Sequence, residues 1–190
     1  MKVIIYTANI GNYDNDIQMN NLEYPFYRIN ISNSKNPRLL AREIKLNPHK
    51  YLQEHDYSIW IDSNIEIVSP KFEFNYDIVT WKHPERDCIY DEGMACIRLK
   101  KEEPEIVFDV LHRYRIENYP NHNGLLCSAY LIRKNTEEVR NFCCEWWDEV
   151  KNNSIRDQLS FNFVIQKYNL NILYQTAYEG FRKIPHKKNR

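Results

Sequence analysis

The sequence has 190 residues, of which 43% are hydrophobic and 27% are charged. This length and balance are typical of one globular domain with a sizeable core, and they exclude a disordered chain. The 26 basic residues equal the 26 acidic ones, so the net charge gives no indication of nucleic acid or an anionic membrane as a partner.

The cysteines and the apolar runs indicate where such a protein would reside. The cysteines are five in number, without CxxC spacing or a histidine cluster nearby: Cys88, Cys96, Cys127, Cys143 and Cys144. This pattern favours a reducing compartment and argues against structural zinc. The apolar start is too short for a signal peptide, and no run approaches membrane-spanning length. We therefore expect a cytoplasmic protein without a transmembrane segment.

The chain opens with a β-branched strand at residues 3–7, followed by a polar loop at residues 8–14. A loop with glycine directly after a first strand is where an α/β fold can place a nucleotide. We expect Thr7, Asn9 and Tyr13 to contact it. Neither a GxGxxG motif nor a P-loop motif is present, so a dinucleotide site is not indicated. A simple surface loop is the alternative.

A second strand is predicted at residues 26–31, and a helix is predicted to start at Pro37. Arg42 and Lys45 lie three residues apart on the polar face of this helix. Two cations one turn apart could hold a diphosphate, and arginine can do so through two parallel hydrogen bonds. The alternative is a solvated helix face.

The most informative stretch is the apolar strand at residues 57–61, which ends abruptly in Asp62, Ser63 and Asn64. Its continuous apolar character predicts a strand covered on both faces, and ligands bind beyond the carboxyl ends of such strands. Asp62 and Asn64 have the spacing of a DxD-like metal site, and their oxygens suit Mg²⁺ or Mn²⁺. An ordinary polar turn is the alternative.

The next strand, at residues 77–81, leads into a segment dense in polar and charged groups at residues 83–92. Its Arg86 is a further candidate to offset the charge of a diphosphate. Helices are predicted at residues 88–100 and 104–118. A turn of His122, Asn123 and Gly124 then precedes a strand at residues 125–133, and we expect this turn to face an acceptor sugar.

The last third of the chain contains two more helices, a strand at residues 172–174 and a basic tail. Asp157, in the first turn of the second helix, is the candidate general base for an acceptor hydroxyl. The spacing from Ser154 to Asp157 also fits a capping box, which is the alternative. His186 in the tail is a candidate third metal ligand that would favour Mn²⁺, and the alternative is a solvated end.

The alternation of apolar strand-like runs with amphipathic helices predicts the fold class. We expect residues 1–190 to form a single three-layer α/β domain, with a mostly parallel central sheet and helices on both faces.

Five motifs in this order resemble one known family. They are the Tyr-Thr-Ala-Asn-Ile-Gly-Asn-Tyr-Asp opening, the Ala-Arg-x-x-Lys helix, the Trp-Ile-Asp-Ser-Asn strand, the His-Pro-x-Arg-x-Cys-x-Tyr-x-Glu segment and the Arg-Asp-Gln-Leu-Ser-Phe helix. Together they are similar to the glycosyltransferase-like family of bacterial and viral polysaccharide genes and plant wall-polysaccharide proteins, long known as a domain of unknown function. The resemblance implies a GT-A type fold that binds a nucleotide-diphosphate sugar and a divalent cation. Asn64 stands where DxD enzymes usually have Asp.

The residues and the resemblance together predict a metal-dependent glycosyltransferase of the hexosyltransferase class. Its partners would be a nucleotide-diphosphate sugar donor and a saccharide acceptor, and its pathway the synthesis of a surface polysaccharide or glycan. A sugar-binding module without catalysis is one alternative. A metal-dependent phosphohydrolase is another, although the acids near Asp62 are scattered along the chain.

Overall fold

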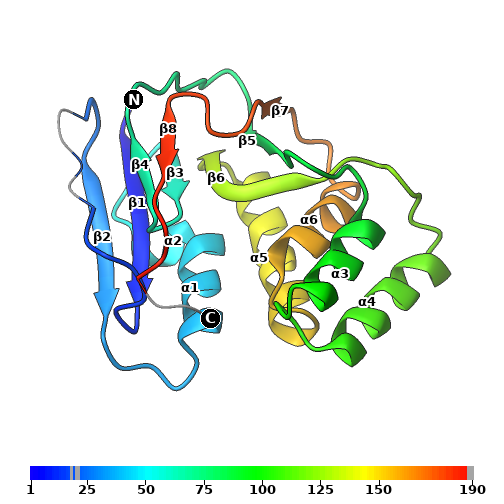
Figure 1. The fold of residues 1–190 in the computed structure, drawn as a ribbon. Coiled ribbons are helices and arrows are strands. Elements are labelled where there is room, and N and C mark those ends of the chain that lie inside the picture. The colour runs from blue at the N-terminus through cyan, green and yellow to red at the C-terminus, as the bar shows by residue number, and fades with distance from the viewer. Residues whose placement is uncertain (18, 20–21, 188–190) are drawn as a thin grey trace.

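The computed structural model describes residues 1–17, 19 and 22–187, and its centre is a six-stranded sheet in the order β2-β1-β3-β6-β5-β7 (Figure 1). Two further strands form a small ribbon in the order β4-β8. The strands are β1 (Val3–Ile10), β2 (Phe26–Ile31), β3 (Tyr57–Ile61), β4 (Ile65–Ile67), β5 (Ile78–Lys82), β6 (Leu126–Lys134), β7 (Ile172–Gln175) and β8 (Phe181–Lys183).

Strand directions confirm a mostly parallel sheet. β1 is parallel to β2 and β3, and β5 is parallel to β7, whereas β6 is antiparallel to both β3 and β5. Within this sheet, β6 alone therefore runs against the other strands. The predicted α/β class is confirmed.

One face of the sheet carries the helices, which Figure 1 shows gathered on the same side. They are α1 (Pro37–Leu46), α2 (Pro48–Tyr51), α3 (Ile89–Arg98), α4 (Pro104–Ile116), α5 (Glu137–Asn152) and α6 (Asp157–Ile165). Their apolar sides pack on inward residues of the strands, such as Trp60 and Leu131, to form the larger core cluster. This layer agrees with the amphipathic pattern of the helical segments.

The opposite face differs from the sequence prediction, which placed helices there as well. Its apolar cluster contains Ile59, Trp81 and Tyr130 of the sheet, and none of the described residues in this cluster belongs to a helix. The ribbon β4-β8 and the aromatic residues of the connecting loops cover this face instead. Phe181 of β8, for example, packs against the rings of Trp81 and Tyr130, with centroid distances of 5.0 and 5.1 Å. Aromatic rings supply enough buried area for this purpose without helical periodicity.

Strand β1 continues through Ile10, although residues 8–10 were predicted to be loop. These residues pair in register with β2 as far as Ile10 and Ile31, and their side chains are buried. The turn begins at Gly11, whose φ of +71° is a conformation that favours glycine.

The strand order places a topological switch point between β1 and β3. β2 lies on one side of β1 and β3 lies on the other, so the connections leave the carboxyl ends of β1 and β3 in opposite directions. Such a point opens a crevice at the edge of an α/β sheet, where ligands bind. Within the described part of the chain, no helix combines the length and the apolar character that a membrane span requires.

The C-terminal segment is held to the rest of the fold, whereas composition alone would leave it as a frayed end. β8 pairs antiparallel with β4, and the carbonyl of Gly180 accepts hydrogen bonds from the amides of Val68 and Ser69. Gly180 has a φ of +79°, and a Cβ at this position would lie 2.5 Å from the carbonyl oxygen of Ser69. Only glycine fits here without moving the backbone.

We expect Gly180→Ala to lower the free energy of unfolding by about 3 kcal/mol, because it adds a backbone clash to the strain of a positive φ. Gly124→Ala is the matched control, since Gly124 also has a positive φ (+81°) but its Cβ would meet only the side-chain nitrogen of Asn162 at 3.4 Å. That control is expected to cost about 1 kcal/mol. Urea unfolding of both variants measures the difference, and equal losses would contradict the proposed clash.

Candidate functional site

A pocket of about 170 Å³ lies at the switch point, beyond the carboxyl ends of β1 and β3. Its wall combines the end of β1 and the following loop, the first turns of α1, the end of β3 and one residue of the C-terminal tail. The residues predicted from the sequence that line it are Asn9, Tyr13, Arg42, Asp62, Asn64 and His186. Segments far apart in the sequence are thus brought together as expected for a ligand site.

Asp62 is presented to the pocket by the strand that precedes it. The indole nitrogen of Trp60 donates a 2.8 Å hydrogen bond to Oδ1 of Asp62, and the amide of Asp62 donates to the carbonyl of Ala129 on β6. The side chain of Asp62 is 33% exposed. Because residues two apart in a strand share a face, Trp60 fixes the carboxylate from the buried side while its outer part remains open.

Lys45 lies in a buried cluster of charges next to Asp62. Its ammonium group is 2.6 Å from Oδ2 of Asp157, 2.9 Å from Oγ of Ser128 and 3.8 Å from Oδ1 of Asp62. Burial lowers the pKa of Lys45, and the two carboxylates offset part of that effect. Lys45 is 1% exposed and is not part of the pocket wall, so the structure corrects its predicted contact with a diphosphate.

Asp157 is also buried at 1% exposure, and it accepts hydrogen bonds from Lys45 and Ser128. Burial by itself would raise its pKa, but the charges of Arg42 and Lys45 outweigh that effect and hold the pKa well below the usual range. A carboxylate that is buried, paired and hard to protonate cannot serve an acceptor hydroxyl as a base. The base role predicted for Asp157 is therefore corrected.

The alternative reading, a capping box of Ser154 and Asp157 at the start of α6, is not formed either. α6 begins at Asp157 itself, and its N-cap residue Arg156 makes no side-chain capping bond. The hydroxyl of Ser154 donates instead to the carboxylate of Glu102, at 3.1 Å. Asp157 instead forms an ion pair with Arg42, whose Nε lies 3.3 Å from its Oδ1.

Asp14 is a pocket residue that the sequence analysis missed. The side chain of Asn9 bonds both the amide and the carbonyl of Asp14 and so folds the loop inward. One carboxylate oxygen of Asp14 accepts a hydrogen bond from Ser63, and the other is 2.6 Å from Nδ1 of His186. The sequence did contain a signal for it, because Asp14 is an acid at the end of the loop that already held the predicted contacts Asn9 and Tyr13.

The tail reaches the pocket through Asn64 as well as through His186. Nδ2 of Asn64 donates to the carbonyl of Ile184 at 2.9 Å, and the amide of Ile184 donates to the carbonyl of Asn64 at 2.8 Å. The ring of His186 packs against Tyr13, with a centroid distance of 4.9 Å. These contacts hold the tail, and with it the predicted metal ligand His186, close to the predicted ligand Asn64.

The chemistry of these groups fits a hard or borderline divalent cation. Asp62 and Asp14 offer carboxylate oxygens, Asn64 retains its amide oxygen, and the contact of Asp14 with Nδ1 of His186 leaves Nε2 for a metal. Carboxylates with one imidazole suit Mn²⁺, and carboxylates alone suit Mg²⁺. A carboxylate that orients a histidine in this way is common around metal ions.

The first turns of α1 form part of the pocket wall, through Pro37, Arg38 and Arg42. The N-cap side chain of Asn36 accepts the amide of Leu39 and so starts the helix cleanly. Helix N-termini attract anions, and two guanidinium groups add full positive charge. Arg38 was missed, although its place directly after the helix-initiating proline was a usable signal.

Besides Lys45, two further predicted nucleotide contacts lie outside the pocket wall. Thr7 is buried, and its hydroxyl has no hydrogen-bond partner among the described residues. The guanidinium of Arg86 is bound by carboxylates, with Nε 2.7 Å from Glu92 and Nη1 2.9 Å from Glu85. In this arrangement Arg86 neutralises the buried Glu92 rather than a ligand in the pocket.

The turn predicted to contact an acceptor also lies outside this pocket. Its His122 is exposed and binds Oδ1 of Asp87 through Nδ1 at 2.7 Å. Nδ2 of Asn123 donates to the hydroxyl of Tyr119 at 3.2 Å, and Gly124 supplies a positive φ. A role of the turn in sugar binding stays a prediction.

The paired charges predict an acid-sensitive fold. Because the pKa of Asp157 is lower in the folded chain, its contribution to stability is complete above the unfolded value of about 3.9 and is lost as the pH falls below it. At pH 7, Asp157→Asn should cost about 3–5 kcal/mol, because Lys45 would lose its buried partner.

Urea unfolding as a function of pH checks this prediction. The wild-type protein should lose stability on acidification more steeply than Asp157→Asn. The control is Asp148→Asn, since Asp148 is an exposed carboxylate on α5. Parallel pH profiles for the wild type and Asp157→Asn would contradict the prediction.

Solved structures that align with this chain include two glycosyltransferases. One is a glycosyltransferase involved in the glycosylation of the major capsid of PBCV-1, with a TM-score of 0.51 and 9% identity over 94% of this chain and 83% of that chain. The WbbM bifunctional glycosyltransferase aligns with a TM-score of 0.49 and 10% identity over 92% of this chain and 38% of that one. A197 from STIV aligns with a TM-score of 0.45 and 11% identity, over 93% of this chain and 83% of that chain. At 9% identity, the likeness to the capsid glycosyltransferase shows a similar fold and nothing more.

The sequence itself identifies the family. No curated protein matches this chain as a relative. The family model described as TOD1/MUCI70, glycosyltransferase-like domain, matches residues 24–184, a range that includes the Asp62 strand, the buried Lys45 and Asp157 pair and most of the ordered tail. The resemblance inferred from the five motifs is confirmed, and the chain belongs to the TOD1/MUCI70 glycosyltransferase-like family.

Proposed function

We propose that this protein transfers a sugar from a nucleotide-diphosphate donor to a saccharide acceptor with the help of Mn²⁺ or Mg²⁺. The observation that carries this proposal is the pocket at the switch point, whose wall includes both Asp62 and the N-terminal turns of α1 with Arg42. Stabilising the negative charge of a diphosphate takes a cation held by carboxylates, and also hydrogen-bond donors for the oxygens that the cation does not contact. Synthesis of a surface polysaccharide or glycan in the cytoplasm is the setting that we propose.

Arg42, Arg38 and the first turn of α1 would bind the diphosphate. Nε of Arg42 lies 3.3 Å from Oδ1 of Asp157, and this ion pair keeps the guanidinium beside the buried carboxylate. Positioned donors of this kind stabilise the charge that develops on a departing diphosphate. Asp157 is thus a positioning residue in this proposal, acting through Arg42.

Asp62 would be the main metal ligand, with Asn64, Asp14 and His186 as further candidates. When bound, the cation supplies positive charge at the diphosphate oxygens. Lys45 lies 3.8 Å from Oδ1 of Asp62 and offsets part of the negative charge of the carboxylates from the buried side. The tail, fixed through Asn64 and Asp14, would exclude water from the transfer.

Two other functions remain to be separated from transfer. A sugar-binding module would bind the donor without releasing the nucleoside diphosphate. A phosphohydrolase would cleave the phosphate group whether or not an acceptor is present. Incubation with a panel of nucleotide-diphosphate sugars, Mn²⁺ and saccharide acceptors distinguishes them, because only a transferase forms a lengthened saccharide together with the nucleoside diphosphate.

Asp62→Asn should abolish turnover and metal-dependent binding of nucleoside diphosphates in calorimetry, because it removes the negative charge that holds the cation. The melting temperature should change little, since the amide oxygen can still accept the hydrogen bond from Trp60. Glu66→Gln, at a partly exposed acid on β4 that pairs with Arg182, is the control and should retain binding. Unaltered affinity in Asp62→Asn would refute the metal role.

His186→Ala should weaken binding of a nucleoside diphosphate about tenfold with Mn²⁺, which accepts imidazole more readily than Mg²⁺ does. The loss should be smaller with Mg²⁺. Lys183→Ala is the control for a general loss of positive charge in the tail, because Lys183 contacts the ring of Tyr178 and does not line the pocket. Equal losses with both metals would exclude His186 as a ligand.

A further inference from the structure

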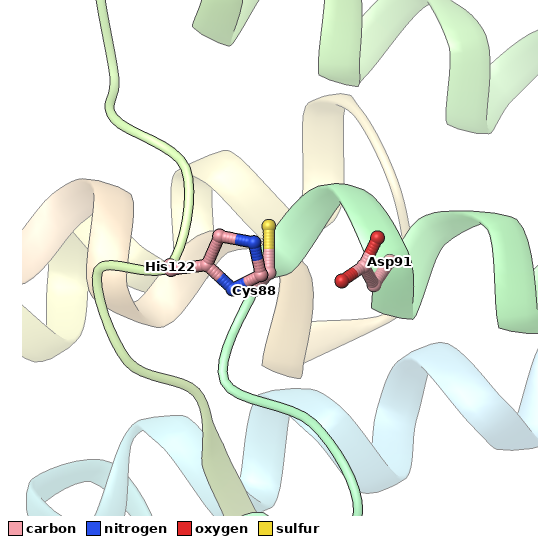
Figure 2. A group of neighbouring side chains, drawn as sticks. All are labelled: Cys88, Asp91 and His122. Carbon is pink, nitrogen blue, oxygen red and sulfur yellow. The ribbon is translucent and has the colours of Figure 1, made fainter.

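A second group of potential metal ligands lies outside the pocket, at the start of α3 and in the turn before β6. Cys88, Asp91 and His122 each direct one ligand atom to a common place, and these atoms lie within 4.8 Å of one another. Figure 2 shows the thiol of Cys88 beside the imidazole of His122, with the carboxylate of Asp91 in the first turn of the helix. The three residues come from two segments that the fold brings together.

Cys88 is well placed to provide a sulfur ligand. It is the N-cap residue of α3, is 2% exposed and makes no side-chain capping bond. Cysteine sulfur is a common zinc ligand, and the fold brings this one close to the ligand atoms of Asp91 and His122. Asp91 lies three residues further on, so both side chains project from the same face of the first turn.

His122 is oriented for a ligand by a neighbouring carboxylate. Oδ1 of Asp87 lies 2.7 Å from Nδ1 of His122, which leaves Nε2 as the coordinating nitrogen. In Figure 2 one ring nitrogen is next to the sulfur of Cys88. Carboxylate, histidine and metal commonly follow one another in this order, because the carboxylate fixes the ring and its tautomer.

We propose that Cys88, Asp91 and His122 bind a zinc ion, with Asp87 as the positioning residue behind His122. A mixed set of sulfur, nitrogen and oxygen suits zinc better than Mg²⁺ or Mn²⁺. Tetrahedral zinc with bonds of about 2.0–2.3 Å places its ligand atoms about 3.3–3.8 Å apart. The exposed side chains of Asp91 and His122 would move inward by about 1 Å to reach this geometry.

The site differs from the four-ligand structural zinc that the cysteine spacing argued against. It has three protein ligands, and a water molecule or a ligand group would complete the coordination. Separate explanations exist for each residue: Cys88 as a small core residue, Asp91 as a charge at a helix start and His122 as the partner of Asp87. None of them accounts for the meeting of the three ligand atoms. A bound ion would fasten the turn at residues 121–124 to α3.

Titration of the metal-free full chain with Co²⁺ tests the proposal, because cobalt replaces zinc and reports its ligands in the absorption spectrum. The wild-type protein should show a thiolate-to-cobalt charge-transfer band and the d–d bands of a tetrahedral site, and equimolar Zn²⁺ should remove both. Cys88→Ser should lose the charge-transfer band and still fold, since serine is a favourable N-cap residue. His122→Ala and Asp91→Asn should weaken cobalt binding, and Asp87→Asn should weaken it about 10–100-fold while the band remains.

Matched controls separate this site from other groups in the chain. Cys144→Ser removes a partly exposed cysteine near His49, and His112→Ala removes an exposed histidine of α4, and both should leave the spectrum unchanged. Asp62→Asn should leave the thiolate-to-cobalt band unchanged, because the pocket at Asp62 has no cysteine among its described residues, so this outcome is independent of the proposed transferase. Absence of a thiolate band in the wild type, or its persistence in Cys88→Ser, would overturn the proposal.

Discussion

The buried pair of Lys45 and Asp157 is the interaction on which the rest of the site depends. It joins α1 to the first turn of α6, and Ser128 of β6 bonds both partners. Two charges without access to water are stable only while each satisfies the other, so the three elements must keep their relative positions. Arg42 lies 3.3 Å from Asp157 and Asp62 lies 3.8 Å from Lys45, and these are the two charged groups that the buried cluster presents to the pocket.

A second constraint closes the pocket from the other side. The turn after β3 and the tail exchange backbone and side-chain hydrogen bonds through Asn64 and Ile184, while Asp14 bonds both Ser63 and His186. The tail owes its order to the ribbon β4-β8, which also covers the helix-free face of the sheet. One short segment therefore protects the core and completes the wall of the pocket.

Much of the fold could be predicted from the sequence because its signals are local. Apolar runs marked the strands of the central sheet, and Pro37 marked the start of α1 as observed. The short strands β4 and β8 were not predicted, because three residues carry too little periodicity. Helices were expected on both faces of the sheet, but among the described residues the apolar cluster on the face opposite α1–α6 contains none from a helix. Aromatic residues of the loops fill that space instead.

The sequence by itself determined the chemical groups of the site and their order along the chain. The polar tip after an apolar strand indicated Asp62, and the helical spacing placed Arg42 and Lys45 on one face. Only the tertiary structure decided which of these groups reach the pocket, because burial and charge pairing arise between segments that are distant in sequence. For this reason Lys45 and Asp157 proved to be each other's partners. Likewise, no spacing rule could bring Cys88 to His122, since the contact exists only after α3 and the turn before β6 have packed together.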